Sequence, residues 1–208
     1  MVARLRTAII EGTLSPNQRL PELELAQKLG CGRLTVRSAL LALEKEGLVV
    51  REPNRGARVR DIPLEEVMEV TEARMALEGL LARKAATRLT DETAQNLLAI
   101  ITEMETVVAA GDLLRYSELN RKLHRAIREV VGAHIIRQLL EQLDALMARF
   151  QFRLALVPGR AQQSLAQHRA LVEALVARDP QEAERRMREH LESVHDTLTR
   201  LTPTTTVL

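Results

Sequence analysis

Apolar and polar residues alternate along this chain with two different periods. In the first 60 residues the apolar positions predict short helices at 2–11, 22–29 and 33–46, followed by β-rich runs at 48–51 and 57–60. From residue 64 onward, a sustained 3.6-residue period predicts longer helices at 64–88, 91–109, 112–131, 133–156, 160–177 and 180–201. The pattern therefore predicts a mainly α-helical protein with one small β element.

Turn-forming residues divide the chain into two unequal parts. Glycine, proline and asparagine cluster in the first 60 residues, whereas the later glycines are widely spaced. Pro63 suits the first turn of a new helix, because a backbone N–H at this position, which proline lacks, would have no partner within the helix. A chain of 208 residues is long enough for two small domains. We therefore expect a domain over 1–62, a helical domain over 63–201 and a disordered, threonine-rich tail over 202–208.

The order of elements in the first domain is that of a winged helix-turn-helix. Three helices precede two short strands, which are joined by the turn-forming sequence at 53–56. Apolar residues of the second and third helices can bury one another, which leaves the start of the third helix free to project. That start carries Arg33, Thr35 and Arg37.

Positive charge is concentrated in the same region and points to DNA. Residues 1–60 carry a net charge of +5, whereas residues 61–208 carry −3. Arg33 and Arg37 lie about 40° apart on one helix face, at the end that a helix-turn-helix inserts into the major groove. Arg55 and Gly56 make a small, positive hairpin tip that can approach the DNA backbone or minor groove. The alternative is a solvated arginine face with no nucleic-acid partner.

Three histidines fall on apolar helix faces in the second domain. At 100° per residue, Asn120 and His124 lie on the apolar side of helix 112–131, and Arg128 falls opposite with the other charged residues. His168 and His190 lie within or beside the apolar stripes of their own helices. A divalent metal such as zinc or nickel would satisfy three buried imidazoles at once. The alternative is that each histidine forms its own hydrogen bond in the core. His134 and His195 are expected at the surface, and Tyr116 is expected to serve packing.

Composition excludes several other classes of function. Aromatic residues make up 1% of the chain, which is too few for a platform that stacks single-stranded bases. Cys31 is the single cysteine and cannot form an internal disulfide, and no apolar run is long enough to span a membrane. The first residues also lack the pattern of a secretory signal. We therefore expect a cytoplasmic protein without a membrane partner.

The first domain resembles the operator-binding domain of the GntR family of bacterial transcription regulators. The matching stretches cover essentially all of residues 1–60: Ser15-Pro16-Asn17-Gln18-Arg19-Leu20, Leu25-Ala26, Leu29-Gly30, Thr35-Val36-Arg37-Ser38-Ala39-Leu40, Leu43-Glu44, Glu46-Gly47-Leu48 and Arg55-Gly56. The resemblance implies a DNA-binding winged helix. The family usually has serine or threonine at Gly32 and a basic residue at Leu23, so two phosphate contacts are absent here.

The second domain is similar to the effector-binding domain of the FadR-type branch, known as the FCD domain. The resemblance is carried by Asn120-x3-His124, Gln167-His168-Arg169 with Glu173-Ala174-Leu175, and Arg188-Glu189-His190-Leu191. It implies a divalent metal held by three histidines and an aspartate, and a response to small organic acids. Position 120 is Asn here, and a neutral amide is a weaker metal ligand than a carboxylate. Arg74 matches an arginine that can pair with an effector carboxylate, although it is equally compatible with a surface position.

Together these observations predict a homodimeric transcription regulator and not an enzyme. One winged helix per subunit would bind half of a two-fold symmetric double-stranded operator. A small carboxylate bound at the metal by Asn120, His124, His168 and His190 would modulate that binding. Two alternatives remain open at this point: a metal-dependent hydrolase that uses the three histidines, and a metal-free regulator whose histidines bind the acid directly.

Overall fold

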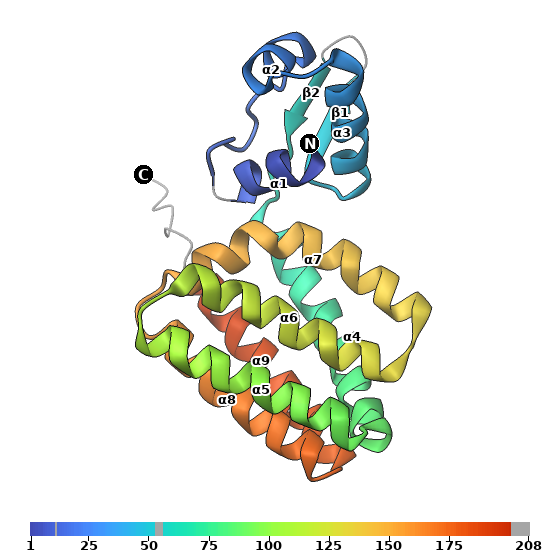
Figure 1. The fold of residues 1–208 in the computed structure, drawn as a ribbon, viewed down its shortest axis with the longest axis vertical. Coiled ribbons are helices and arrows are strands. Elements are labelled where there is room, and N and C mark those ends of the chain that lie inside the picture. Colours follow the sequence, from blue (N-terminus) through green and yellow to red (C-terminus); the bar gives the residue numbers. More distant parts are fainter. Residues whose placement is uncertain (11, 53–55, 201–208) are drawn as a thin grey trace. The chain divides into compact units, whose positions relative to one another are not determined.

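The computed structural model describes residues 1–10, 12–52 and 56–200, except for the side chains of residues 148, 149, 151 and 152. The predicted tail at 202–208 and the predicted DNA contact Arg55 therefore lie outside the described residues. The chain forms two compact units, which are described separately below (Figure 1). The first comprises residues 1–63 with 141–149, and the second comprises 64–140 with 150–208, as far as these are described.

The first unit is a small winged helix-turn-helix, as the sequence predicted. Its elements are α1 (Val2–Ile10), α2 (Glu22–Leu29), α3 (Arg33–Lys45), β1 (Val49–Glu52) and β2 (Gly56–Val59). The two strands are antiparallel and pair in a register that joins Val49 to Val59 and Glu52 to Gly56. The strands were predicted at 48–51 and 57–60, so β1 begins one residue later and β2 one residue earlier than predicted. Leu48 and Arg60 lie just beyond the paired segment.

Packing of the first unit leaves the beginning of α3 exposed. Gly30 ends α2 in the left-handed conformation, at φ 64°, and the chain reverses there into α3. Apolar side chains from all five elements then form one buried cluster: Leu5, Ile9, Leu20, Leu25, Ala26, Val36, Ala39, Leu40, Leu43, Leu48, Val49, Ala57 and Val59. Because the buried residues of α3 begin at Val36, the first turn of this helix projects from the core.

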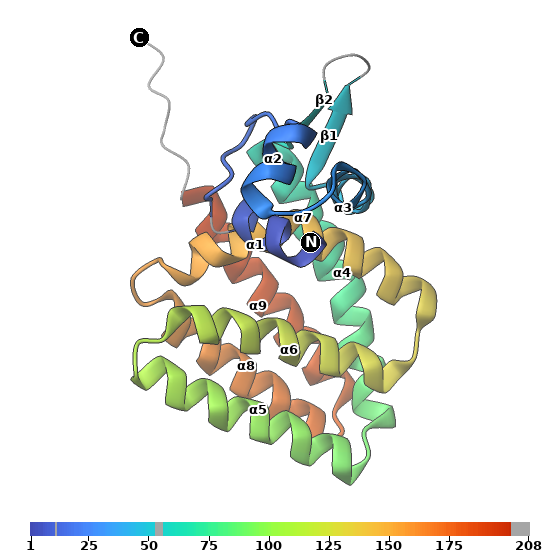
Figure 2. The ribbon, with the colours of Figure 1, turned by 45° about the horizontal axis from the view of Figure 1, so that its top comes forward.

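The second unit is an antiparallel helical bundle. Its helices are α4 (Leu64–Arg88), α5 (Asp91–Ala109), α6 (Leu113–Val131), α8 (Arg160–Val176) and α9 (Pro180–Arg200), together with both ends of α7 (His134–Ala155), whose middle residues 141–149 belong to the first unit. Helix α4 packs along α9, and α9 also packs against α8 (Figure 1). Helix α5 packs against both α6 and α8, and the two views agree on this order (Figure 2). The predicted fold class is therefore confirmed.

Capping side chains explain where several of these helices begin. Thr90 accepts a hydrogen bond from the backbone N–H of Thr93, and the Thr93 hydroxyl accepts from the backbone N–H of Thr90. Asp179 accepts from the backbone N–H of Glu182 at 3.0 Å and so caps the start of α9. Asp112 caps α6 in the same way, so this helix begins at Leu113 and not at residue 112.

Within the described part of the chain, no helix combines the length and apolar character needed to cross a membrane.

Candidate functional site

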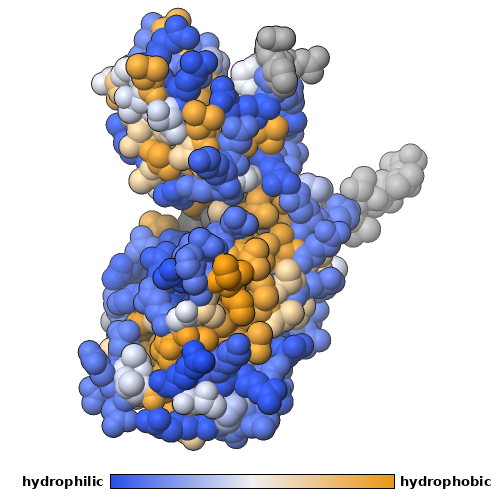
Figure 3. Space-filling view, turned by 90° about the vertical axis from the view of Figure 1, so that its right-hand side faces the viewer, coloured by the Kyte–Doolittle hydropathy of each residue, from blue (hydrophilic) through white to orange (hydrophobic). Residues whose placement is uncertain are grey.

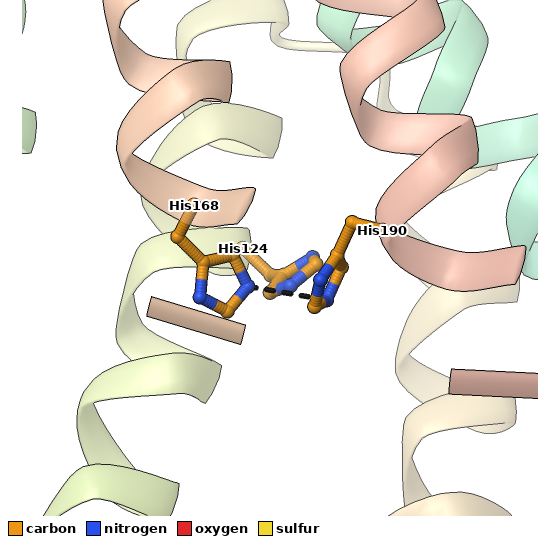
Figure 4. A group of neighbouring side chains, drawn as sticks. All are labelled: His124, His168 and His190. Carbon is orange, nitrogen blue, oxygen red and sulfur yellow. Dashed lines mark hydrogen bonds between the residues drawn. The ribbon is translucent and has the colours of Figure 1, made fainter. Parts of the chain in front are cut away.

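The three predicted histidines meet inside the helical unit. His124 comes from α6, His168 from α8 and His190 from α9, and all three are buried. Their ring centroids lie 5.4 Å apart for His124 and His168, 5.5 Å for His124 and His190, and 4.2 Å for His168 and His190. Figure 4 shows the three rings converging from their separate helices. Each ring offers one nitrogen within 4.8 Å of the other two, so the cluster could hold a metal ion.

Hydrogen bonds at the back of two rings orient their nitrogens. His124 Nδ1–H donates to Oε2 of Glu78 at 2.6 Å, and His190 Nδ1–H donates to Oε1 of Gln167 at 3.1 Å. A ring whose Nδ1–H donates in this way turns its Nε2 toward the other two rings, and in the neutral form that Nε2 carries the lone pair. The Nε2 atoms of His168 and His190 are 3.1 Å apart, which places His168 as the donor in this pair. A carboxylate or amide behind a ligating histidine is the usual arrangement in metal sites.

Burial keeps two of the histidines neutral. Burial lowers the pKa of His168 and of His190 well below the ordinary value, and the nearby charge of Arg160 lowers both further. At neutral pH these rings are therefore uncharged. Neutral imidazole is the form that binds a metal, so no proton has to leave either ring first.

A buried ionic cluster supports His124. The Glu78 carboxylate is 2.7 Å from Nη2 of Arg74 and 3.1 Å from Nη2 of Arg128, in addition to its bond with His124. Burial alone would raise the pKa of Glu78, but the charges of Arg74, His124 and Arg128 outweigh it and hold this pKa well below its usual range. Sequence reasoning missed the role of Glu78. The available signal was the four-residue spacing of Arg74 and Glu78, which places opposite charges on one helix face.

The ionic cluster also corrects two expectations about arginines. Arg128 was predicted on the polar side of α6, but it is buried. Its charge can be buried because Glu78 lies beside it, and helical periodicity alone does not contain that information. Arg74 is buried as well, so the alternative of a surface position is wrong.

A cavity of about 40 Å³ lies beside the histidines. Its polar lining includes His124, His190, Asn120 and Arg160, and its apolar lining includes Leu154, Ala155, Leu191 and Val194. Arg74 also lines it, with its guanidinium engaged by Glu78. The side-chain oxygen of Asn120 is buried and has no hydrogen-bond partner. A buried acceptor of this kind is costly unless something in the cavity pairs with it.

The other residues of this unit that were named in the sequence analysis lie outside the cluster of three histidines. His134 is exposed, and His195 is half-buried, with Nε2 3.9 Å from Glu72. Tyr116 is buried in the wall of the cavity.

The predicted DNA-binding residues lie on the exposed first turn of α3. Arg33, Thr35 and Arg37 are all exposed. Glu22, at the start of α2, lies 3.9 Å from Nη2 of Arg33 and 3.3 Å from Nε of Arg37. The sequence analysis did not foresee this carboxylate, which holds both guanidinium groups at the surface. Exposed ion pairs of this type are weak, so a phosphate can replace Glu22 as the partner.

A groove of about 640 Å³ runs beside these arginines. It is lined by Pro21, Glu22, Leu23, Arg33, Arg37, Arg51, Glu52 and Gly56. Gly56 begins β2 with φ 81°, a backbone conformation that disfavours any side chain. The groove thus joins the exposed turn of α3 to the tip end of the hairpin, where Glu52 pairs with Gly56, and this is the surface that a winged helix presents to DNA.

Comparison with known proteins identifies both parts of the chain. Residues 1–59 match the gntR family of bacterial regulatory proteins, and residues 69–193 match the FCD domain. The HTH-type transcriptional repressor GlaR of Escherichia coli K12 is 30% identical over 195 residues, covering 90% of this chain and 89% of the relative. The repressor RspR of the same organism is 25% identical over 194 residues, covering 93% and 85%.

Solved structures share the fold. E. coli McbR/YncC superposes with a TM-score of 0.82 at 23% identity, covering 96% of this chain and 95% of that one. A GntR regulator from Rhodococcus sp. RHA1 gives a TM-score of 0.80 at 22% identity, covering 97% of both chains. The matched families and curated relatives are transcription regulators and not enzymes. This chain belongs to the GntR family of bacterial transcription regulators and carries an FCD domain in its helical part.

Proposed function

We propose that this regulator binds its operator as a homodimer and that a small organic acid, bound beside a divalent metal in the helical unit, modulates that binding. The observation that carries the proposal is the meeting of three buried histidines beside a cavity. A ligand in this cavity shifts operator binding only if it has different affinities for the two states of the dimer.

The exposed turn of α3 is the part that reads DNA in this proposal. Arg33 and Arg37 can each donate two parallel hydrogen bonds to a guanine edge, and Thr35 lies between them on the same turn. Arg55 and Gly56 at the hairpin tip are proposed to contact the backbone or the minor groove.

Substituting Arg33 by alanine is expected to weaken binding to the specific operator by about 1–3 kcal/mol. The loss should be smaller for random DNA, because base contacts carry the discrimination. Fluorescence anisotropy at one fixed salt concentration measures both affinities. Lys45→Ala, at the exposed far end of the same helix, is the matched control. If Arg33→Ala discriminates between operator and random DNA as well as wild type does, Arg33 does not contribute to sequence recognition.

The residues present fit a divalent metal. His124, His168 and His190 would hold it, with the unpartnered oxygen of Asn120 as the fourth ligand. When bound, the ion supplies a positive, Lewis-acidic point for an acid group. His168 and His190 supply neutral imidazoles, and Glu78 and Gln167 fix the orientation of the His124 and His190 rings.

Replacing Asn120 by aspartate is expected to tighten zinc binding, because a carboxylate is a better ligand for this cation than an amide. Competition with a chelator of known affinity measures the change. Asn96, which is exposed on α5, gives the control substitution Asn96→Asp. The same zinc affinity in wild type and Asn120→Asp would place residue 120 outside the ligand set.

The homodimer is proposed to form through the helical unit. Figure 3 shows an apolar band across one face of that unit. Helix α4 and the first turns of α7 lie toward this side, and they expose Leu80, Ile135 and Leu139. Ile135 is 68% exposed, which is unusual for such a large apolar side chain.

Light scattering is expected to give twice the chain mass of 23.3 kDa for the wild-type protein. Ile135→Glu should shift the mass toward the monomer, because it would place a charge in an apolar interface. Leu98→Glu, an exposed leucine on α5, is the control and should remain dimeric. A monomeric wild type would contradict the proposal.

A metal-free regulator is the second candidate, and one observation favours it. The direct contact between Nε2 of His168 and Nε2 of His190 satisfies both atoms without an ion. Elemental analysis of protein purified without a metal-affinity tag separates the two candidates.

A further inference from the structure

Polar residues line the cavity in successive layers. On α6, Tyr116, Asn120 and His124 follow one another at intervals of four residues. On α8, Arg160 and Ser164 line the cavity with the same interval, and His168 of the histidine cluster follows four residues later. Residues four apart stay on one face of a helix, so each set forms one polar stripe. The cavity therefore has a histidine end and an opposite end at Arg160 and Tyr116.

Among the described residues, the buried guanidinium of Arg160 has no carboxylate partner. It is 4% exposed, and its guanidinium donates only to neutral partners, namely Oε1 of Gln163 at 3.1 Å and Oγ of Ser193 at 2.8 Å. Its Nη2 is buried and has no hydrogen-bond partner. Arg74, in contrast, is paired with Glu78. Burying a charge without a counter-charge costs free energy, so an anion bound beside Arg160 would be stabilising.

The guanidinium lies close enough to the histidines to share a ligand with them. Its partner Ser193 follows His190 by three residues, which is nearly one turn of α9. Arg160 and His190 line the same cavity. Because three residues of helix rise about 5 Å, a ligand of about that length can reach from His190 to the Arg160 guanidinium.

The remaining lining suits a short organic anion. Burial raises the pKa of the Tyr116 phenol, so its hydroxyl stays protonated and can donate. Ser164 and Ser117 add two more hydroxyl groups, and the lining contains no aspartate or glutamate. Leu154 and Leu191 supply apolar contacts for a short carbon chain.

We propose that Arg160 binds a second acidic group of the ligand, so that the cavity accepts a short dicarboxylate with one carboxylate at the histidine end and the other at Arg160. This rests on the proposed function only in placing the first carboxylate at the histidines.

The test is calorimetric titration of the zinc-loaded full chain with malonate and succinate, each compared with the monocarboxylate of equal chain length, propionate and butyrate. Wild type should bind at least one dicarboxylate about tenfold or more tightly than its matched monocarboxylate, because a charge-assisted bond is gained. Arg160→Gln should abolish that preference, so that each dicarboxylate binds no more tightly than its matched monocarboxylate. Arg160→Lys, which keeps the charge, should retain part of it.

Arg169→Gln removes an exposed arginine from the same helix and is the control. Far-UV circular dichroism and zinc content confirm that each variant is folded and loaded. Equal affinity of wild type for the two kinds of acid would overturn the assignment of Arg160. The effector proposal would survive that result, provided that the monocarboxylates bind. Absence of binding by all four acids would contradict both.

Discussion

Substituting Glu78 by alanine is expected to lower the free energy of unfolding by about 3–5 kcal/mol. The carboxylate is 1% exposed and accepts hydrogen bonds from Arg74 and His124, with Arg128 3.1 Å away. Its removal leaves buried guanidinium groups without this counter-charge, and that cost exceeds what the pairing itself contributed. Urea-induced unfolding followed by circular dichroism measures the loss.

The matched control is Glu72→Ala on the same helix, where the side chain is largely exposed. It should change the free energy of unfolding by less than about 0.5 kcal/mol. In Glu78→Gln the partially retained hydrogen bonding should keep the protein folded, and zinc affinity should fall about 10- to 100-fold because His124 loses its charged support. An alanine variant as stable as wild type would show that the cluster does not hold the bundle together.

Substituting His168 by alanine is expected to lower zinc affinity by more than about 100-fold, since it removes a direct ligand and not only a supporting residue. His168 is fully buried beside His124 and His190, and no other histidine of the described residues joins this cluster. The winged helix should still bind DNA, because its core is built from its own residues. Zinc content by elemental analysis and operator binding by anisotropy give the two readouts.

The exposed His134 provides the control, and His134→Ala should keep full zinc occupancy. Equal zinc occupancy in wild type and His168→Ala would rule out the ligand assignment. Loss of DNA binding by His168→Ala together with loss of helicity would instead indicate general unfolding, and circular dichroism of the same samples detects this.

The fold could be predicted from sequence because its signals are local. Apolar spacing placed the helices, and turn residues such as Gly30 marked where one helix had to end. The cap of α9 at Asp179 is a signal of the same local kind, since its hydrogen bond connects residues three positions apart. Even the convergence of three histidines followed from their positions on apolar helix faces.

The supporting parts of the site could not be predicted because they depend on contacts between distant segments. Periodicity placed Arg128 on a polar face, but Glu78, fifty residues earlier in the chain, lies 3.1 Å from its guanidinium and supports its burial. The Glu22 partner of Arg33 and Arg37 depends in the same way on how α2 packs against α3. Arg160 lies at the first position of its helix, where a polar residue is unremarkable until its burial is known.

The measurement that most directly tests the coupling of acid and operator uses a DNA duplex selected by the zinc-loaded wild-type protein from a random pool. Anisotropy gives its Kd with and without saturating malonate at constant salt concentration. The account predicts a change of at least about fivefold in Kd, the lower end of typical coupling between two sites. An unchanged Kd, under conditions where calorimetry shows malonate bound, would contradict it.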